Sequence, residues 1–368
     1  MKDSSEEIDL PMKKVLVFHP ALAPYRIDFF NLLSERVDLV VVFLLRNLED
    51  QKFDQSKLLA MTRFRYRYLD RGFNFKSRFF RFGVRKLLKE EKPDVVVGYE
   101  FSPITCLLAL LARHGRWRFW TSSDDNEMQI ESCRGVRNAI RSFVLNRLDG
   151  IITTNKTSSL ALKAVNQKIQ TREVPIVHDT ASMRKNADRV FAEGMSWRRE
   201  NIPSSWRKIL VFVGRLAPEK NLHWLVDRMK DSPEGIGLLI VGDGDERSSL
   251  ERQIANNELC NRVILAGRFE GDALYGIMAA SDLLVLASKF EPFGAVVAEA
   301  LAWGTPVAVS DCVGAKTLID DYNGRIFPLS DQTMFWPCVM DAMSCKKGCH
   351  SLLRTDLRSA VDELAGAL

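Results

Sequence analysis

Two glutamates, Glu291 and Glu299, bracket the segment EPFGAVVAEA, where an apolar strand-like run changes into a helix-like pattern. Eight positions are a little over two helical turns, so the two carboxylates face roughly the same side, about 12 Å apart along a complete helix. A carboxylate accepts hydrogen bonds from sugar hydroxyls, and a helix start offers backbone N–H groups and partial positive charge to phosphate. The spacing therefore suits an extended phosphorylated ligand, although an amphipathic helix with two solvated glutamates would show it too.

Two cations lie upstream, in the segment LVFVGRLAPEKNL at residues 210–222. Four apolar residues predict a strand, Gly214 opens a turn, and Arg215 and Lys220 follow five positions apart. A strand, a glycine turn and two cations at a helix start form a diphosphate-binding arrangement on electrostatic grounds. Taken singly, an arginine at the end of a strand is as often an ordinary surface residue.

Together, the two segments resemble the retaining glycosyltransferases of family 4, also called group 1. The resemblance is dense from about residue 210 to residue 310 and far weaker in the N-terminal half. It is carried by Gly214-Arg215-Leu216, Glu219-Lys220-Asn221, Glu291-Pro292-Phe293-Gly294, Glu299-Ala300, LIVGDGD (239–245), VILAGR (263–268), Ser281-Asp282 and GTPVAVS (304–310). The resemblance implies an α/β fold with GT-B architecture, in which two doubly wound, Rossmann-like domains face each other across a cleft.

The resemblance also implies a role for each matching residue in binding a nucleotide-diphosphate sugar. Arg215 and Lys220 would neutralise the leaving diphosphate, where preorganised cations accelerate the bond-breaking step, and Glu291 would contact the donor sugar. Glu299 would bond the nucleotide ribose, and Arg268 would lie where the base is read. The remaining donor site is expected at Gly214, Phe293, Gly294, Ala295 and Val296, with the backbone N–H groups of the last three holding oxygens.

Two patterns could suggest a metal ion, and we predict none. Asp243 and Asp245 have a spacing that could chelate a divalent ion, but they follow a strand and precede a helix, where Gly and Asp are ordinary turn and cap residues. Cys345, Cys349 and His350 do not have the spacing of a zinc ribbon or finger. The GT-B resemblance likewise implies a metal-independent enzyme without a cofactor, with a UDP- or GDP-sugar as donor substrate.

The N-terminal half begins with a strand, a helix and a strand at residues 14–45, which predicts a parallel doubly wound sheet. Ligands of such sheets lie beyond the carboxyl ends of the strands. Candidate acceptor-side residues at such ends are Tyr25, Arg26, Glu100, Ser123, Asp124 and His178. The family often has a glycine pair near Tyr25 and a histidine near Ser123, so both positions depart from its pattern. For His178, a capping or core role is at least as compatible with the sequence.

The 368-residue length favours two domains of ordinary size. We expect a disordered leader at residues 1–12 and an acceptor-side domain at 13–203, with its linker in the charged segment before residue 204. The nucleotide-sugar domain would follow at residues 204–335. The C-terminal helices at residues 336–368 are expected to cross back to the first domain, as the GT-B fold implies.

Residues 63–89 hold ten Lys or Arg, one acid and eight interleaved aromatics. We expect a strand with one buried face at residues 63–68 and a basic amphipathic helix at residues 77–89. The stretch is compatible with core aromatics beneath solvated cations, or with docking on an anionic membrane surface. Binding to nucleic acid is disfavoured because no other feature supports it.

Composition and cysteine usage point to the cytoplasm, or to the inner face of a membrane. No apolar run approaches the roughly 20 residues that a membrane-spanning helix needs, and the polar, acidic N-terminus does not resemble a signal peptide. Seven scattered cysteines suit a reducing compartment better than a disulfide framework.

The predicted function is that of a retaining hexosyltransferase acting in cell-surface polysaccharide synthesis. It would move a sugar from a nucleotide-diphosphate sugar to a hydroxyl of a glycan or lipid-linked acceptor. A nucleotide-sugar 2-epimerase of the same fold and a noncatalytic nucleotide-sugar-binding subunit remain open as alternatives. A dehydrogenase is disfavoured because neither half opens its first helix with G-x-G-x-x-G.

Overall fold

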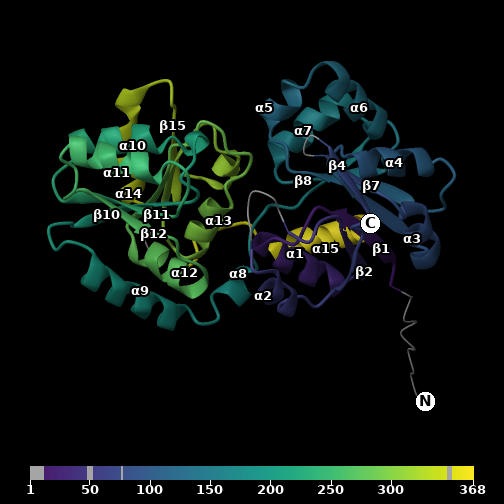
Figure 1. Cartoon of the computed structure of the whole chain (residues 1–368), viewed down its shortest axis with the longest axis horizontal. Coiled ribbons are helices and arrows are strands. Elements are labelled where there is room, and N and C mark those ends of the chain that lie inside the picture. Colours follow the sequence, from purple (N-terminus) through teal and green to yellow (C-terminus); the bar gives the residue numbers. More distant parts are fainter. Residues whose placement is uncertain (1–11, 48–52, 76–77, 346–349) are drawn as a thin grey trace, which may run out of the picture. The chain divides into compact units, whose positions relative to one another are not determined.

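The chain forms two compact units, which Figure 1 shows coloured along the sequence. The computed structural model describes residues 12–47, 53–75, 78–345 and 350–368. One unit ends at Pro175 and takes in Leu357–Leu368, and the other is Ile176–Asp356. The predicted leader lies outside the described residues except for Met12, and so does Cys349.

The first unit is built on a seven-stranded, fully parallel sheet. Its strands are β1 (Lys14–His19), β2 (Asp38–Phe43), β3 (Arg65–Tyr68), β6 (Val95–Tyr99), β7 (Arg118–Ser123), β8 (Gly150–Thr153) and β9 (Gln170–Glu173). They lie in the order β3-β2-β1-β6-β7-β8-β9. The central strands are almost continuous apolar runs because both faces of a parallel sheet are covered. Val15, Leu16, Val96 and Phe119 are accordingly buried almost completely.

Helices cover this sheet, and local sequence signals place several of their starts. The helices are α1 (Pro24–Ser34), α2 (Gln55–Ala60), α3 (Val84–Glu91), α4 (Pro103–Leu111), α5 (Glu127–Glu131), α6 (Gly135–Leu145), α7 (Lys156–Val165) and α15 (Leu357–Ala367). Asn126 forms a capping box with Gln129 at the start of α5, and Asn155 caps α7 by accepting from Ser158 N.

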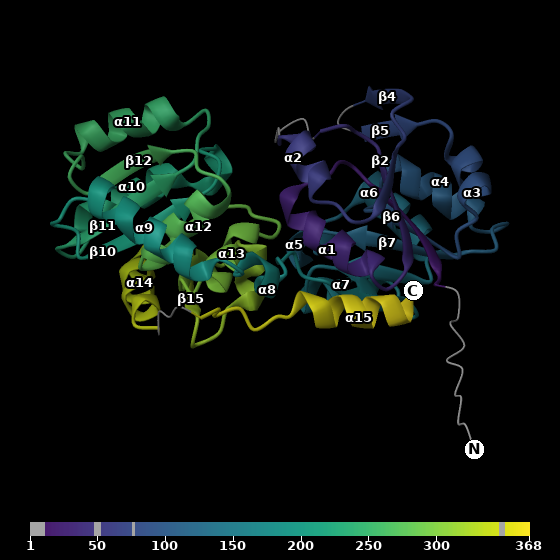
Figure 2. The same cartoon turned by 90° about the horizontal axis from the view of Figure 1, so that it is seen from below.

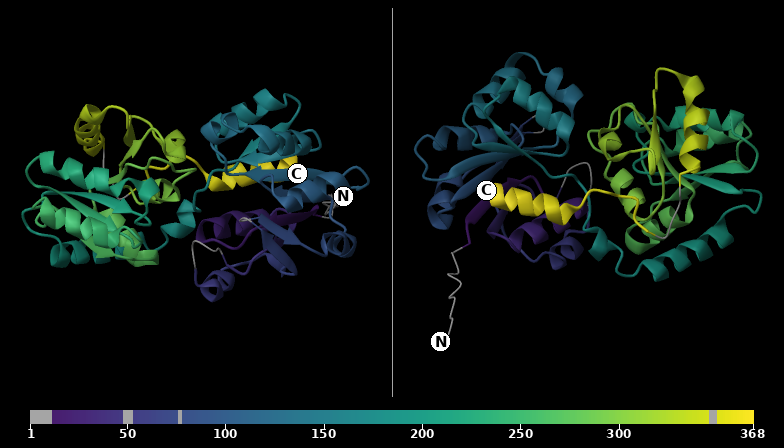
Figure 3. Two further views of the ribbon diagram at one scale, coloured as in Figure 1. Left: turned by 45° about the horizontal axis from the view of Figure 1, so that its top comes forward. Right: turned by 180° about the vertical axis from the view of Figure 1, so that it is seen from behind.

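The last helix, α15, belongs to the first unit although it is separated from it by more than 180 residues of sequence. It lies along α1 in Figure 2, and Figure 3 shows it in yellow against the first unit. An ion pair between Arg36 and Asp362 joins it to the end of α1, and Arg118 donates to the Leu368 carbonyl at 3.0 Å. The helix before it, α14 (Phe335–Met343), stays in the second unit, so the boundary predicted at residue 336 is too early.

The basic aromatic stretch differs from the helix predicted at residues 77–89. Its second part forms an antiparallel hairpin, β4 (Gly72–Phe75) with β5 (Arg78–Arg81), followed by the short helix α3. Gly83, at φ 98°, separates β5 from α3 and explains why no single helix runs through the segment. The first part is β3, which forms one edge of the sheet and exposes its arginines. On the opposite face Phe64 is buried, Tyr68 is half-buried and Tyr66 is 39% exposed, so the predicted buried face is formed only in part.

The second unit has a six-stranded parallel sheet. Its strands are β10 (Lys208–Val213), β11 (Ile236–Val241), β12 (Val263–Gly267), β13 (Leu283–Leu286), β14 (Val307–Ser310) and β15 (Gly324–Phe327), in the order β12-β11-β10-β13-β14-β15. Its α-helices are α8 (Thr180–Met183), α9 (Ala187–Asn201), α10 (Leu222–Arg228), α11 (Arg247–Asn256), α12 (Gly271–Ala280), α13 (Ala295–Ala302) and α14. Four 3-10 turns complete it: η1 (Pro218–Lys220), η2 (Met229–Asp231), η3 (Gly314–Leu318) and η4 (Gln332–Met334). The two doubly wound domains predicted from the sequence are thus present.

The helix α9 lies in the second unit, not in a linker of the first. It packs along α12, as Figures 1 and 2 show, through two glycines that allow the backbones to touch. A Cβ on Gly194 would lie 2.0 Å from the Gly276 carbonyl oxygen. The boundary between the units therefore falls at Pro175 and not at residue 203.

Among the residues that the structure describes, no helix has both the length and the apolar character that crossing a membrane requires.

The glycine contact between α9 and α12 gives a prediction about stability. In Gly194→Ala, the added methyl meets main chain, which cannot rotate away, so the free energy of unfolding should fall by about 1–3 kcal/mol. Gly366→Ala is the matched control, because Gly366 is also helical and its Cβ would have nothing within 4 Å. Urea denaturation followed by circular dichroism measures both; equal midpoints for Gly194→Ala and the parent would contradict the packing.

Candidate active site

The second sheet changes its direction of winding between β10 and β13, and the best-matched motifs lie there. From β10 the chain builds β11 and β12 on one side, and then β13, β14 and β15 on the other. In such sheets the loops on either side of this point separate and leave a crevice for ligands. The loop after β10 carries Gly214, Arg215 and Lys220, and the loop after β13 carries Glu291.

Lys220 and Glu291 form an ion pair at this point. Lys220 ends η1 immediately before Asn221, whose left-handed backbone (φ 59°) turns the chain into α10. The two loops are also joined by a main-chain bond of 2.8 Å from Lys289 N to the Glu219 carbonyl. The side chains of Lys220 and Glu291 are only 16% and 14% exposed. A cation and a carboxylate that were predicted as catalytic are therefore paired where solvent has little access.

Gly294 starts α13 and brings its first turn next to Glu291. It has φ 93°, and a Cβ there would be 3.1 Å from the Glu291 Cγ. Ala295 and Val296, predicted to present N–H groups, are the first two residues of the helix and are half-buried. Phe293 is buried beneath them. The residues predicted for this part of the donor site are therefore neighbours in the structure.

The loop after β14, which the sequence analysis did not single out, is hydrogen-bonded to the turn before α13. Gly314 N donates to the Glu291 carbonyl at 2.9 Å, and Ala315 N donates to that of Phe293 at 2.6 Å. A Cβ on Gly314 would lie 1.9 Å from the Pro292 carbonyl oxygen, so only glycine fits. The available signal was a glycine just after β14, at the same edge of the sheet.

Glu299 lies about one turn into α13 and contacts His178. The distance from His178 Nε2 to Glu299 Oε1 is 3.3 Å, with both side chains less than one-fifth exposed. Both residues belong to the second unit. His178 was expected among the acceptor-side residues of the first domain, and that placement is wrong, because the second unit begins two residues before it.

Two other predicted donor residues are exposed arginines with neighbouring carboxylate partners. Arg215 Nη2 bonds Glu219 Oε1 at 2.9 Å, and Arg268 pairs with Glu270 just after β12. Among the described residues, Arg268 forms its ion pair with Glu270 and no hydrogen bond or ion pair with Lys220 or Glu291. In the loop after β11, Asp243 accepts a bond from Gly244 N at 2.9 Å, which agrees with a turn role.

The first sheet has its own change of winding between β1 and β6, and the acceptor-side candidates meet there. Arg26, buried on α1, donates from Nη2 to both carboxylate oxygens of Asp124, at 2.6 and 2.7 Å. The ring centroid of Tyr25, the preceding residue, lies 5.9 Å from the guanidinium carbon of Arg26. Burial raises the pKa of the Tyr25 hydroxyl. Ser123 is buried, and its Oγ accepts from Asp125 N at 3.4 Å. The ion pair that unites Arg26 and Asp124 could not be read from residues 98 positions apart.

His19, at the end of β1, completes this group although it was not singled out. Its Nδ1 lies 2.9 Å from the Ala21 carbonyl, and Nε2 is buried without a hydrogen-bond partner among the described residues. Burial, reinforced by the charge of Arg26, lowers the pKa of His19 to about 3, so the imidazole is neutral at ordinary pH. Its position at a strand end was the signal that could have identified it.

Glu100, at the carboxyl end of β6, is an unusual carboxyl group. Its backbone is left-handed (φ 48°), and its N–H donates to the Ser122 carbonyl at 2.6 Å. Burial, together with the negative charges of Asp124 and Asp125, raises the pKa of Glu100 to about 7. A carboxyl group that titrates near neutrality at such a position is a functional candidate.

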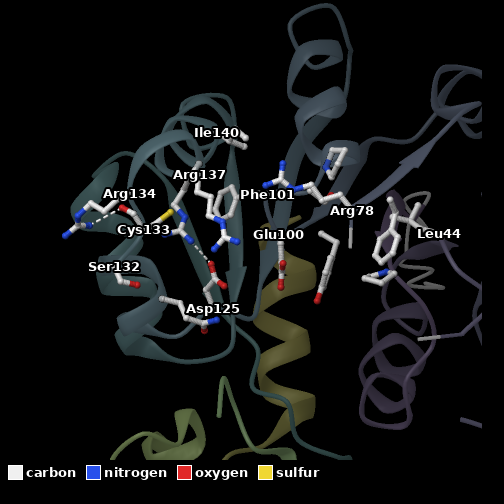
Figure 4. Close-up of a pocket in the computed structure, with 17 residues that line it drawn as sticks. Leu44, Arg78, Glu100, Phe101, Asp125, Ser132, Cys133, Arg134, Arg137 and Ile140 are labelled. Carbon is white, nitrogen blue, oxygen red and sulfur yellow. Dashed lines mark hydrogen bonds and ion pairs between the residues drawn. The ribbon is translucent and has the colours of Figure 1, made fainter. Parts of the chain in front are cut away.

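Glu100 lines a pocket of about 600 Å³ within the first unit. Figure 4 shows Glu100 near the middle of this pocket, with Asp125 on one side and Arg78 on the other. Asp125 bonds Arg141 of α6 at 2.6 Å, and the Arg141 guanidinium lies 5.0 Å from the Phe101 ring centroid. The pocket residues from α5 and α6 were missed, because those helices are far from β6 in sequence.

Two doubly wound parallel domains, each with its charged cluster where the winding reverses, define the class of GT-B glycosyltransferase folds. The solved structure of Anabaena Alr3699/HepE in complex with UDP and glucose has a similar fold. It is 18% identical, has a TM-score of 0.70, and covers 96% of this chain and 98% of its own. Residues 196–354 match the family model of glycosyl transferases group 1.

Curated relatives match the chain in part. The 2-deoxystreptamine glucosyltransferase of Streptomyces kanamyceticus is 30% identical over 194 residues, which are 52% of this chain and 49% of that protein. The lipopolysaccharide core biosynthesis glycosyltransferase LpsE of Rhizobium meliloti is 31% identical over 128 residues, 34% of this chain and 37% of that protein. The chain thus spans half or less of the length of these relatives.

The raised pKa of Glu100 gives a prediction about pH. The folded state binds this proton more tightly than the unfolded state, so the contribution of Glu100 to stability is lost as pH rises from about 4.5 to about 7. Glu100→Gln removes the ionised carboxyl, and its stability relative to the parent should rise by about 2 kcal/mol between pH 5 and pH 8.

Urea midpoints of parent and variant at the two pH values measure this change. The control is Glu131→Gln, at an exposed carboxyl of the same unit, whose difference from the parent should be the same at both pH values. A pH-independent effect of Glu100→Gln would show that the carboxyl is ionised throughout.

Proposed function

We propose that this chain is a retaining glycosyltransferase that transfers a hexose from a nucleotide-diphosphate sugar to an acceptor hydroxyl. The single observation that carries the proposal is the Lys220–Glu291 ion pair at the winding reversal of the second sheet. It lies within the segment that matches the group 1 family, beside the start of α13. A cation, a helix start and a carboxylate are the three groups needed for a diphosphate joined to a sugar.

On this proposal, the donor lies across the loops that follow β10 and β13. Lys220 and Arg215 hold the diphosphate, and the first N–H groups of α13 add bonds to its oxygens. Glu291 accepts from sugar hydroxyls, while Glu299, oriented by His178, accepts from the ribose. As the glycosidic bond breaks, negative charge grows on the diphosphate, and Lys220 is already in place to stabilise it.

Retention follows from a front-face displacement, in which the leaving phosphate helps to deprotonate the acceptor hydroxyl. The acceptor is a growing cell-surface glycan or its lipid-linked precursor, bound on the first unit near Arg26, Asp124 and Glu100. The relative LpsE, a lipopolysaccharide core biosynthesis glycosyltransferase, supports a growing cell-surface glycan as the acceptor. The donor is a UDP- or GDP-sugar: the structural neighbour was solved with UDP, and a curated relative from Mycolicibacterium smegmatis is a GDP-mannose-dependent alpha-mannosyltransferase.

We also propose that the β4–β5 hairpin places the protein on the inner face of an anionic membrane. Phe73 and Phe75 of β4 are 53% and 58% exposed, and Phe82, the residue that follows β5, is 62% exposed. Both arginines of β3, and the arginine that begins β5, are exposed in the same stretch of the chain. Exposed aromatics among cations suit the interface of a bilayer with negative headgroups. A lipid-linked acceptor would be reached from such a position.

A nucleotide screen tests the donor site. With UDP, GDP, ADP and CMP, and then their sugars, one diphosphate nucleotide should raise the melting temperature of the protein. Arg215→Ala and Lys220→Ala each remove a charge-assisted bond, so each should weaken binding about 10- to 100-fold. EDTA should leave the shift in melting temperature unchanged, because on this proposal Arg215 and Lys220, and not a metal ion, neutralise the diphosphate.

Lys289→Ala is a suitable control, since it changes a cation in the same region that carries none of the proposed phosphate contacts. Turnover with an acceptor distinguishes the transferase from a binding subunit, and epimerised donor without acceptor would indicate the 2-epimerase. If folded protein binds none of the four nucleotides, the proposed donor site is wrong.

Vesicle flotation tests the hairpin. Binding to vesicles that contain phosphatidylglycerol should weaken roughly tenfold in Phe75→Ser with Phe82→Ser, since two rings no longer enter the interface. It should also fall sharply in 0.5 M salt, which screens the arginines. Phe290→Ser is the control, at a 44% exposed ring in the second unit. If the double variant binds the vesicles as tightly as the parent protein, these aromatic side chains do not contact the membrane.

A further inference from the structure

The pocket around Glu100 is rich in positive charge. Its charged lining groups are four arginines and two carboxyls, namely Arg78, Arg134, Arg137, Arg141, Glu100 and Asp125. The balance is +2 when Glu100 is ionised and +3 when it is protonated. We call this site the arginine pocket. Its charge is opposite to that expected of a site that only accepts bonds from neutral sugar hydroxyls, where carboxylates would prevail.

Some of this charge is already used inside the protein. Arg141 is buried and neutralises Asp125, with 2.6 Å between Nη2 and Oδ2. Arg134 turns to main-chain oxygens and donates to the Cys133 carbonyl at 3.0 Å. Arg78, from β5, and Arg137, from α6, make no ion pair with any residue that the structure describes. These two cations are the ones available to a ligand.

The rest of the lining has the character of a binding site. Aromatic groups of Tyr99, Phe79 and Phe101 give it apolar walls, and Ser102, Gln129 and Ser132 supply uncharged polar groups. Its volume of about 600 Å³ lies in the range of sites for small ligands. The ligand that such a lining fits has a ring with hydroxyl groups and at least one strong anion.

We propose that the arginine pocket binds a phosphate-bearing acceptor, with Arg78 and Arg137 holding the phosphate. This deepens the proposed function, on which it rests, by naming the class of acceptor. A guanidinium forms paired bonds with phosphate oxygens, and two of them match the charge of a phosphate monoester. The acceptor is then a sugar phosphate, free or carried on a lipid. The raised pKa of Glu100 lets this neighbouring carboxyl become neutral as the anion approaches.

Glucose 6-phosphate and glucose form a matched pair of probes, because they differ only in the phosphate. Calorimetric titrations are made on the full chain, with the donor site filled by the nucleotide found in the screen. Glucose 6-phosphate should bind at least tenfold more tightly than glucose. Arg78→Gln with Arg137→Gln should remove that advantage, because two charge-assisted contacts are lost.

Arg85→Gln is the control variant, at an exposed arginine on α3 that does not line the pocket. A second arm compares vesicles that contain phosphatidylinositol, whose headgroup is a hydroxylated ring joined to a phosphate, with vesicles that contain phosphatidylglycerol. It uses Arg137→Gln alone, since Arg137 lies outside the hairpin proposed to contact membrane. The proposal is supported if vesicle binding needs Arg137, or if the tighter binding of glucose 6-phosphate needs Arg78 and Arg137. The first result would indicate a phosphate carried on a lipid, and the second a free sugar phosphate. The proposal is overturned if glucose 6-phosphate binds no more tightly than glucose and the vesicle binding does not need Arg137, or if the variants bind as well as the parent in both arms.

The outcome is separable from that of the proposed function. The double variant should keep the nucleotide shift, because the donor site lies on the other unit and uses Arg215 and Lys220. Nucleotide binding without a phosphate preference would reject the arginine pocket alone. If no nucleotide binds, the titration without nucleotide still tests the pocket.

Discussion

The charged pair Lys220–Glu291 depends on one constraint: parallel strands must bring their carboxyl ends to a single edge. β10 and β13 are neighbours in the sheet although some seventy residues separate them, so the loops that follow them meet. The Lys289–Glu219 main-chain bond and the Gly314–Glu291 bond then fix the loops. Removing either charge would leave the other partly buried without its partner, which costs more than a surface ion pair contributes. The site is therefore part of what stabilises this edge.

At the corresponding edge of the first sheet, different residues pair the buried charges. Arg26 neutralises Asp124 and Arg141 neutralises Asp125, each through a short, part-buried pair. Glu100 is the third carboxyl at this edge, and no described residue forms an ion pair with it. Burial and two negative neighbours then raise its pKa, because ionising it would add a third charge. The carboxylates at this edge of the first sheet thus belong to one charge arrangement, in which two are paired with arginines and the third has a raised pKa.

Sequence reasoning succeeded where short segments determine the result. Apolar runs identified the buried strands, and the motifs that carry Lys220 and Glu291 identified two residues that the fold brings into contact. It failed where contacts between distant segments decide. The glycines of α9 and α12 assign a charged helix to the second unit, and Gly83 divides an apparent amphipathic helix into a hairpin and α3. The arginine pocket combines β5, β6, α5 and α6, which no local pattern connects.

On the proposed function, the Lys220–Glu291 pair also couples the two ends of the donor. A diphosphate attracts Lys220 and brings new negative charge next to Glu291, which would be unfavourable in a place this poorly solvated. Glu291 then needs another donor, and the hydroxyls of an attached sugar are the groups that can replace the ammonium. A nucleotide diphosphate without its sugar would satisfy only Lys220. The same ion pair can therefore favour the intact sugar nucleotide over the released nucleotide, which assists product release after transfer.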